Sequence, residues 1–199
     1  GAHVSPESAP EIARIFQGGL YFSRPTHLVC DVEAGSLGYE YPLMLLGSII
    51  PQTESPDMLA LVFLLDPRKD FSNFISMGSL GETGNSYAFD REGRMLSRCR
   101  HEDQLATLGL LQPGQGAILN LYLRDPGRKL TAKDSAADAQ NNRLKHPPVR
   151  SVVSAIARSE GVLTSRYRDY RGVWVFGAWK WLDEYDFGIV SEIESKEVL

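Results

Sequence analysis

The stretch Tyr167-Arg-Asp-Tyr-Arg-Gly-Val-Trp-Val-Phe-Gly-Ala-Trp-Lys-Trp181 decides the fold of the C-terminal half of this chain, because it holds two predicted strands and their turn. Side chains alternate between the two faces of a strand. One face of the second strand therefore carries Trp174, Phe176, Ala178 and Lys180. The other face carries Val175, Gly177, Trp179 and Trp181. This pattern predicts a sheet packed on both sides. The alternative is that one face, where Gly177 or Ala178 leaves space, lines a cavity.

The residues from Gly81 onward predict one α+β lobe. Its strand candidates are Ser86–Asp90, Arg94–Arg98, Ala117–Leu123, Leu163–Arg168, Val173–Leu182 and Phe187–Glu194. A helix is predicted over Val149–Glu160, after a long polar segment of the kind that is usually functional. A hairpin, a helix and a final three-stranded meander fit an antiparallel five-stranded sheet with helices on one face.

The N-terminal residues predict part of a second, similar lobe. A helix begins near Ser8, and strands are predicted over His27–Val32, Leu43–Ile50 and Met58–Leu65. A further helix begins at Asp66-Pro67, since aspartate caps helices and proline suits the first turn. We therefore assign 1–78 to an incomplete first lobe and 79–199 to a second lobe. The apolar strands of the first lobe expose edges that need a partner.

Composition and charge exclude several classes of protein. The chain has 199 residues, 43% of them hydrophobic, and a net charge of −4, which argues against a nucleic-acid partner. The basic stretch Arg166–Arg171 interleaves arginine with tyrosine, and we interpret it as a twisted strand with a solvated face. The apolar stretches are too short to span a bilayer. The start, Gly-Ala-His, lacks an initiator methionine and a signal peptide, so we expect a piece of a longer protein.

Known catalytic and metal-binding motifs are missing from the sequence. The glycine-rich stretch Gly78–Gly84 lacks the Lys-Ser/Thr of a phosphate loop and precedes a strand, so its glycines are interpreted as turn formers. The four histidines are scattered, and no Gly-x-Ser-x-Gly elbow occurs. Cys30 and Cys99 form no disulfide framework, and their redox state is open. We therefore expect no enzymatic activity, no metal and no cofactor.

Three segments together resemble the double Cache sensor domains, the extracytoplasmic PAS-like modules of bacterial chemoreceptors, sensor kinases and cyclases. They are Gly81–Ser97, Tyr167–Trp179 and Phe187–Glu194, with their "G-E-T-G … D-x-x-G-R-x-L-S" and "Y-x-D-Y-R-G … G-A-W" motifs. The resemblance implies a PAS-like fold, a small-molecule ligand, a membrane-anchored parent protein and an extracytoplasmic (periplasmic or extracellular) location. The Arg-x-Trp-Tyr signature of the amino-acid-binding subgroup is missing, so amino acids are not supported as ligands.

The PAS-like layout predicts a ligand pocket between the sheet and the helix and loops that cover it. By that geometry the ligand-binding candidates are Tyr87, Phe89, Arg98, Tyr167, Tyr170, Trp174, Trp179 and Lys180. Both faces of the tryptophan-rich strand are represented because its facing is open. The two cations favour a small organic ligand with an anionic group.

Three functions remain in competition. A sensor that binds a small metabolite needs a preformed apolar cavity with one or two buried cations. A relay or dimerisation module, working as a homodimer, needs a filled core and an exposed apolar helix face. An enzyme built from dispersed residues needs a buried carboxylate or histidine with a shifted pKa beside a cleft.

Overall fold

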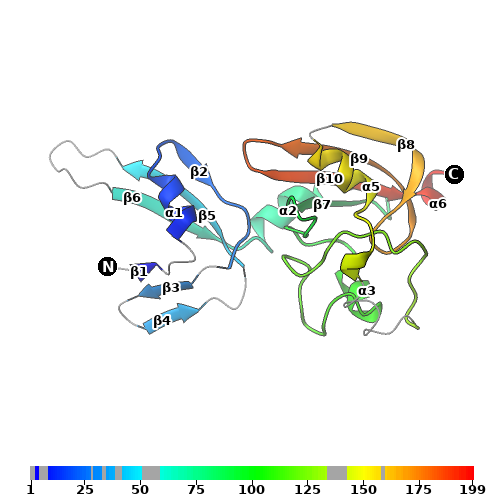
Figure 1. Ribbon diagram of the computed structural model, residues 1–199, viewed down its shortest axis with the longest axis horizontal. Coiled ribbons are helices and arrows are strands. Elements are labelled where there is room, and N and C mark those ends of the chain that lie inside the picture. The colour runs from blue at the N-terminus through cyan, green and yellow to red at the C-terminus, as the bar shows by residue number, and fades with distance from the viewer. Residues whose placement is uncertain are drawn as a thin grey trace. The chain divides into compact units, whose positions relative to one another are not determined.

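The computed structural model describes residues 3–4, 9–27, 29–32, 35–38, 42–50, 59–133, 143–157 and 160–199. The chain divides into two compact units, Gly1–Pro67 and Arg68–Leu199 (Figure 1). Helix α2 (Asp70–Ser76) belongs to the second unit, where its Ile75 packs with Ala88 and Phe187. The assignment of 1–78 and 79–199 to two related lobes stays a prediction.

The described residues of the first unit form two antiparallel three-stranded sheets and one helix. The first sheet has the order β2-β5-β6, with strands β2 (Leu20–Phe22), β5 (Met44–Ile50) and β6 (Leu59–Leu65). The second has the order β1-β3-β4, with strands β1 (His3–Val4), β3 (Val29–Val32) and β4 (Gly35–Gly38). Helix α1 (Ala9–Ile15) packs Ile15 against β5 at Gly47, where a Cβ would lie 2.7 Å from the Ile15 Cδ1 atom. The two apolar strands predicted from the sequence, β5 and β6, pair with each other.

The second unit is built on a four-stranded antiparallel sheet of order β7-β10-β9-β8. Its strands are β7 (Asn85–Phe89), β8 (Gly161–Arg168), β9 (Trp174–Leu182) and β10 (Phe187–Glu194). Its further helices are α3 (Glu102–Thr107), the 3₁₀ turn η1 (Arg143–Lys145), α5 (Arg150–Ile156) and α6 (Ser195–Val198). The expected α+β class, with an antiparallel sheet and flanking helices, is confirmed.

The expected fifth strand does not form in the described part of the second unit. Of Arg94–Arg98, only Arg94 and Met95 make isolated bridges. The segment Ala117–Leu123 forms no continuous strand, because residues 118–120 are a turn, where Leu119 has a φ of 61° and the side-chain amide of Asn120 donates to the carbonyl of Gly116. A polar side chain that bonds its own backbone competes with strand pairing in this way. Beyond the turn, Tyr122 makes an isolated bridge to Arg94. Ala117, Ile118, Leu121 and Leu123 of the segment are nevertheless buried.

The sheet of the second unit has one inner face, which packs against α5. In register, Val190 of β10 lies opposite Tyr87 on one side and Trp179 on the other, so these three side chains share the inner face. Val152 and Ala155 of α5 are buried in the same cluster. The opposite face is covered in part by α2, through Ile75. No helix within the described ranges is long and apolar enough to cross a membrane.

Candidate functional site

A buried carboxyl group lies at the centre of the inner face. Glu192 of β10 is 4% exposed, and its Oε1 accepts hydrogen bonds from the hydroxyls of Tyr167 at 2.8 Å and of Ser151 at 3.3 Å. Burial, together with the charge of Asp169, raises the pKa of Glu192 to about 8. Glu192 is therefore mainly a neutral acid at neutral pH, able to donate as well as accept a hydrogen bond.

The absence of a side chain at Gly177 makes room for this contact. Gly177 lies directly opposite Glu192 in the β9–β10 register. A Cβ at this position would overlap the Tyr167 hydroxyl and lie 3.1 Å from the Glu192 Cγ. The small residue in the tryptophan-rich strand thus accommodates the protein's own tyrosine.

Two further tyrosines extend the polar cluster across the sheet. The rings of Tyr87 and Tyr170 meet edge to face with centroids 5.6 Å apart. Within the described residues the Tyr87 hydroxyl has no hydrogen-bond partner at good geometry. Burial and the charge of Glu192 raise the pKa of the Tyr87 hydroxyl. The Tyr170 hydroxyl accepts a hydrogen bond from the side-chain amide of Asn85 at 3.1 Å. The inner face is therefore both polar and closely filled.

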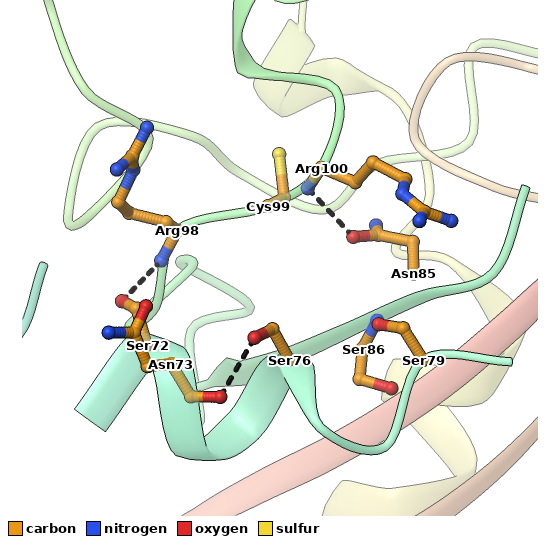
Figure 2. Close-up of a pocket in the computed structure, with 9 residues that line it drawn as sticks. All are labelled: Ser72, Asn73, Ser76, Ser79, Asn85, Ser86, Arg98, Cys99 and Arg100. Atoms are coloured by element: carbon orange, nitrogen blue, oxygen red, sulfur yellow. Dashed lines mark hydrogen bonds between the residues drawn. The ribbon is translucent and has the colours of Figure 1, made fainter. Parts of the chain in front are cut away.

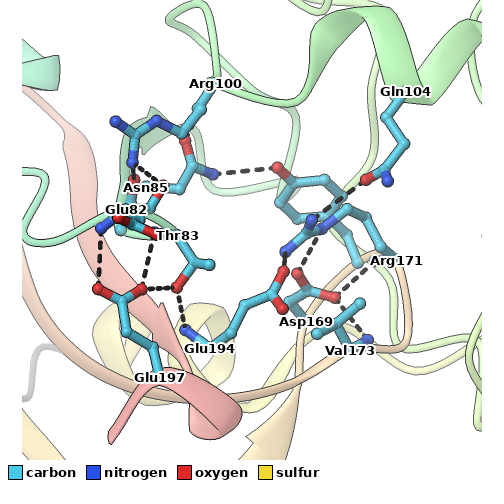
Figure 3. A network of polar contacts seen from close by, with 12 residues as sticks. Glu82, Thr83, Asn85, Arg100, Gln104, Asp169, Arg171, Val173, Glu194 and Glu197 are labelled. Carbon is cyan, nitrogen blue, oxygen red and sulfur yellow. Dashed lines mark hydrogen bonds and ion pairs between the residues drawn. The ribbon is translucent and has the colours of Figure 1, made fainter.

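A buried ion pair closes the turn between β8 and β9, as Figure 3 shows. The Arg171 Nε donates to Asp169 Oδ2 at 2.8 Å, and its other nitrogens reach Gln104 and Glu194 at 3.2 Å. Asp169 also accepts the backbone N–H of Val173 at 2.9 Å. The Asp-Tyr-Arg-Gly segment of the sequence motif thus stabilises a turn and ties it to α3 and β10.

A polar cavity of about 340 Å³ lies beside α2 and β7 (Figure 2). It is lined by Ser72, Asn73, Ser76, Ser79, Asn85, Ser86, Arg98, Cys99 and Arg100. Part of this wall is held by hydrogen bonds, including one from the Arg98 backbone N–H to the Ser72 hydroxyl at 2.8 Å. Serine hydroxyls, amides and guanidinium groups suit a polar organic molecule rather than an apolar one. We name this the α2–β7 cavity.

Two wall residues of the α2–β7 cavity make hydrogen bonds beyond it. Asn85 accepts the Arg100 backbone N–H at 3.0 Å while its amide donates to Tyr170. The Arg100 guanidinium donates to the carbonyls of Glu82 at 2.6 Å and Gly84 at 2.9 Å. The cavity wall is therefore bonded both to the inner face and to the turn that precedes β7.

That turn binds a carboxylate of the protein itself. The Glu197 side chain of α6 accepts the backbone N–H groups of Glu82 and Thr83, each at 2.8 Å, and also contacts the Thr83 hydroxyl (Figure 3). Gly81, with a φ of +66°, gives the turn its left-handed residue. The glycine-rich stretch therefore forms a turn, as the sequence predicts, and its amides hold α6.

The eight predicted ligand-binding residues fall into two groups. The structure brings five of them together on the inner face, namely Tyr87, Phe89, Tyr167, Tyr170 and Trp179. The other three lie elsewhere. Arg98 lines the α2–β7 cavity and pairs with Glu102 at 2.9 Å, and Lys180 is exposed and pairs with Glu160 at 2.8 Å. Trp174 is exposed beneath two arginines. Their role in binding stays a prediction.

Sequence reasoning missed Glu192, Asn85, Arg100 and Glu197. Glu192 shares one face of β10 with Val190 and Gly188, and an acid on an otherwise apolar strand face was the sequence feature that could have indicated it. The other three act through contacts between segments far apart in the sequence, which no local pattern reveals. Within the described ranges, no group of three His, Cys, Asp or Glu side chains is placed to bind a metal ion.

Comparison with known proteins finds similarity in structure only. No family model matches the chain, and no curated protein matches its sequence. Two similar structures are extracellular domains of proteins assigned as histidine kinases, rpHK1S-Z16 and mmHK1S-Z3. Each is 14% identical, over 91% and 94% of this chain, with TM-scores of 0.43 and 0.45. A third is an extracellular ligand binding receptor from Desulfohalobium retbaense DSM5692, 12% identical over 93% of this chain, with a TM-score of 0.48. The chain spans about half the length of the two kinase domains, 56% and 53%, and 24% of the receptor.

Proposed function

We propose that this chain is the extracytoplasmic sensor part of a bacterial transmembrane signalling protein, without enzymatic activity, and that its second unit binds a small polar organic ligand in the α2–β7 cavity. One observation carries the proposal. Asn85 and Arg100 line this cavity, and their hydrogen bonds reach the buried Tyr170 on one side and the Glu82–Gly84 carbonyls on the other. A ligand that touches these two residues contacts groups that are hydrogen-bonded to the core on one side and to the turn that holds α6 on the other.

The chemistry of the wall indicates the class of ligand. The cavity volume of about 340 Å³ is at the lower end of the range for small-molecule sites. Its four serines and two asparagines match a hydroxylated compound, and Arg98 can bind an anionic group at the rim. A sugar acid or a hydroxy acid has both features. The anionic group expected from the sequence is thereby kept, with Arg98 rather than Lys180 as its partner.

Binding in the cavity can act on α6 by shifting a conformational equilibrium. A ligand shifts such an equilibrium only by its difference in affinity for the two states. The Asn85 amide and the Arg100 guanidinium are the groups whose bonds differ if a ligand draws them into the cavity. The turn residues Glu82 and Thr83, which Arg100 and Glu197 hold from two sides, would carry the difference to α6. The resemblance of the turn and meander motifs to double Cache sensors supports the same role.

A thermal-shift screen with matched variants tests the proposal. The library contains hydroxy acids, sugar acids and small amines. Ser76→Leu fills the cavity from the last turn of α2, where the Ser76 hydroxyl donates to the Asn73 carbonyl of its own helix. Thr107→Leu makes a similar change in the last turn of α3, outside the cavity. A ligand at about one hundred times its Kd stabilises the folded state by about 2.7 kcal/mol.

The expected result is a compound that raises the Tm of the wild type and of Thr107→Leu but not of Ser76→Leu. The Arg98→Gln substitution should weaken the binding of an anionic compound more than the binding of its uncharged analogue. A compound that stabilises all variants equally would contradict the cavity as the binding site. If no compound in the library raises the Tm of a folded sample, the second candidate function is favoured.

The second candidate is a relay or dimerisation module that binds no small molecule. It is favoured by the edge strand β6 of the first unit, where Leu59, Leu61 and Phe63 are 50–54% exposed on one face. An apolar surface of this kind on an edge strand suits pairing with another chain. Light scattering of the wild type and of Phe63→Glu distinguishes the two candidate functions. The substitution lowers the measured mass only if the protein dimerises through β6.

A further inference from the structure

A second cavity in the second unit, also of about 340 Å³, gathers positive charge from three separate segments. Its cations are Arg128, Lys129, Arg166, Arg168 and Lys196. They are five of the 21 lysines and arginines of a chain whose net charge is −4. Among the described residues, Glu194 is the acid that lines this cavity, and its Oε1 already accepts a bond from Arg171 at 3.2 Å. The cavity is thus strongly basic in an acidic protein, and we name it the basic cavity.

The loop that contributes two of these cations is fixed by a glycine. Gly172 has a φ of +75°, and a Cβ there would overlap the carbonyl oxygen of Arg128. The backbone N–H of Leu130 donates to the Arg171 carbonyl at 2.9 Å. The loop therefore crosses the β8–β9 turn in close contact, and this contact places Arg128 and Lys129 beside β8. Residues distant in sequence are brought to one site by backbone packing.

The two arginines of β8 are held by an aromatic ring. The guanidinium carbons of Arg166 and Arg168 lie 5.1 Å and 4.3 Å from the centroid of the Trp174 ring. A guanidinium stacked through its face keeps its N–H edge available, and that edge matches two oxygens of a phosphate or carboxylate. Among the described residues, neither arginine has a carboxylate within ion-pair distance, 4.0 Å.

The charge arrangement itself favours an anion. Like charges at short range repel, and a bound oxyanion removes the repulsion and satisfies several N–H donors at once. The sequence alone predicts that Arg166–Arg171 is a twisted strand with a solvated face. The structure divides this stretch, because Arg171 is buried with Asp169 while Arg166 and Arg168 lie with Trp174 in the wall of the basic cavity.

We propose that the basic cavity binds a multivalent oxyanion, either a phosphate group or a pair of carboxylates, through the N–H edges of Arg166 and Arg168 with Lys129 and Lys196 beside them. This site is separate from the α2–β7 cavity and does not depend on the proposed function. The oxyanion can belong to a soluble metabolite or to the headgroup of an anionic lipid. Lys196 is part of α6, so an anion here contacts the same short helix that Glu197 ties to the Gly81–Gly84 turn.

The test measures binding of inorganic pyrophosphate by titration calorimetry and binding to phosphatidylcholine vesicles with and without phosphatidylglycerol. The test variant is Arg166→Gln with Arg168→Gln. The matched control is Lys133→Gln with Arg150→Gln, which removes two exposed positive charges of the same unit outside the basic cavity. Arg168→Lys is a second, milder variant that keeps the charge and loses the planar fork.

The expected result is saturable binding by the wild type and the control, weakened by on the order of tenfold or more in the double-arginine variant and by less in Arg168→Lys. Binding of pyrophosphate without vesicles assigns the site to a soluble ligand, and the reverse assigns it to lipid headgroups. The proposal is overturned if the wild type binds neither probe. It is also overturned if the control loses as much affinity as the double-arginine variant, since the attraction would then be diffuse charge.

Discussion

The Tyr167 hydroxyl lies 2.8 Å from Oε1 of Glu192, and this hydrogen bond joins β8 to β10 across β9 without any side chain from β9 between them. It exists because the residue of β9 that faces both groups is Gly177. The bond is buried, so it is formed in a medium where an unpaired carboxyl group would be costly. Two measurable properties of the protein follow from it.

The first prediction concerns the pH dependence of stability. The pKa of Glu192 is raised to about 8 from an ordinary value of 4.5, so between these pH values the folded state binds more protons than the unfolded state. The contribution of Glu192 to the free energy of unfolding is therefore complete below pH 4.5 and is lost as pH rises to about 8. Its slope is at most about 1.4 kcal/mol per pH unit. Urea unfolding across this range should show a decline in the wild type.

The Glu192→Gln variant should lose this decline, because glutamine keeps an acceptor for Tyr167 and has no proton to lose. Its free energy of unfolding should be close to that of the wild type near pH 5 and higher near pH 8. Glu184→Gln, at an exposed position of the β9–β10 turn, is the matched control and should keep the decline. A variant less stable than the wild type at pH 8 would contradict the assignment of a neutral, proton-bearing Glu192.

The second prediction is a coupling between Gly177 and Tyr167. Gly177→Ala places a methyl group against the Tyr167 hydroxyl and should lower the free energy of unfolding by about 1–3 kcal/mol. In a Tyr167→Phe background the same change should cost clearly less, because the atom that the methyl group meets has been removed. A double-mutant cycle by urea unfolding measures this coupling. Equal costs in the two backgrounds would show that the clash is elsewhere, for example with the β10 backbone.

The third prediction concerns His101. Burial, with the charges of Arg171 and Arg100, lowers the pKa of His101 to about 4. The imidazole is therefore neutral in the folded protein, and its contribution to stability is present above pH 6.5 and lost as pH falls toward 4. A titration of the imidazole signals by NMR, assigned with His101→Gln, should stay flat until about pH 4. A midpoint near 6.5 would contradict burial of this ring.

His101 and Glu192 act in opposite directions below pH 6.5, so their effects on stability partly cancel there. Only the loss due to Glu192 remains between pH 6.5 and about 8. The wild-type decline should therefore be steepest in that interval. The His101→Gln variant should extend the decline to lower pH.

Alternation along β8, β9 and β10 predicted these strands and the residues that share each face. It could not predict which face of β9 is the inner one, since both carry tryptophan. Long-range contacts decide this. Gly177 admits Tyr167, and Gly188 admits the Phe89 ring, so the face with the glycines receives the large neighbours. That is why Trp179 is in the core while Trp174 and Lys180 lie on the other face.

The two cavities could not be predicted from the sequence for a similar reason. The walls of both cavities are built from segments far apart in the chain, and neither wall follows a local pattern. The separate strand candidate Ala117–Leu123 is interrupted by a turn at Leu119, whose positive φ an apolar sequence pattern does not indicate. The glycine-rich turn was correctly predicted as a turn, but its partner, Glu197, lies more than one hundred residues away.

The last prediction tests that partner. Hydrogen bonds from the Thr83 hydroxyl and from the backbone N–H groups of Glu82 and Thr83 lower the pKa of Glu197. The contact is therefore present above pH 4.5 and is lost as pH falls through the lowered value. Glu197→Gln removes the charge and should make the amides of Glu82 and Thr83 exchange hydrogen severalfold faster, with a small fall in Tm because the site is exposed. Hydrogen exchange by NMR measures this, with Glu184→Gln as the control of equal charge change. If these amides exchange at the same rate in the two variants, α6 is not held by this carboxylate, and the proposed effect of a ligand on α6 loses this connection.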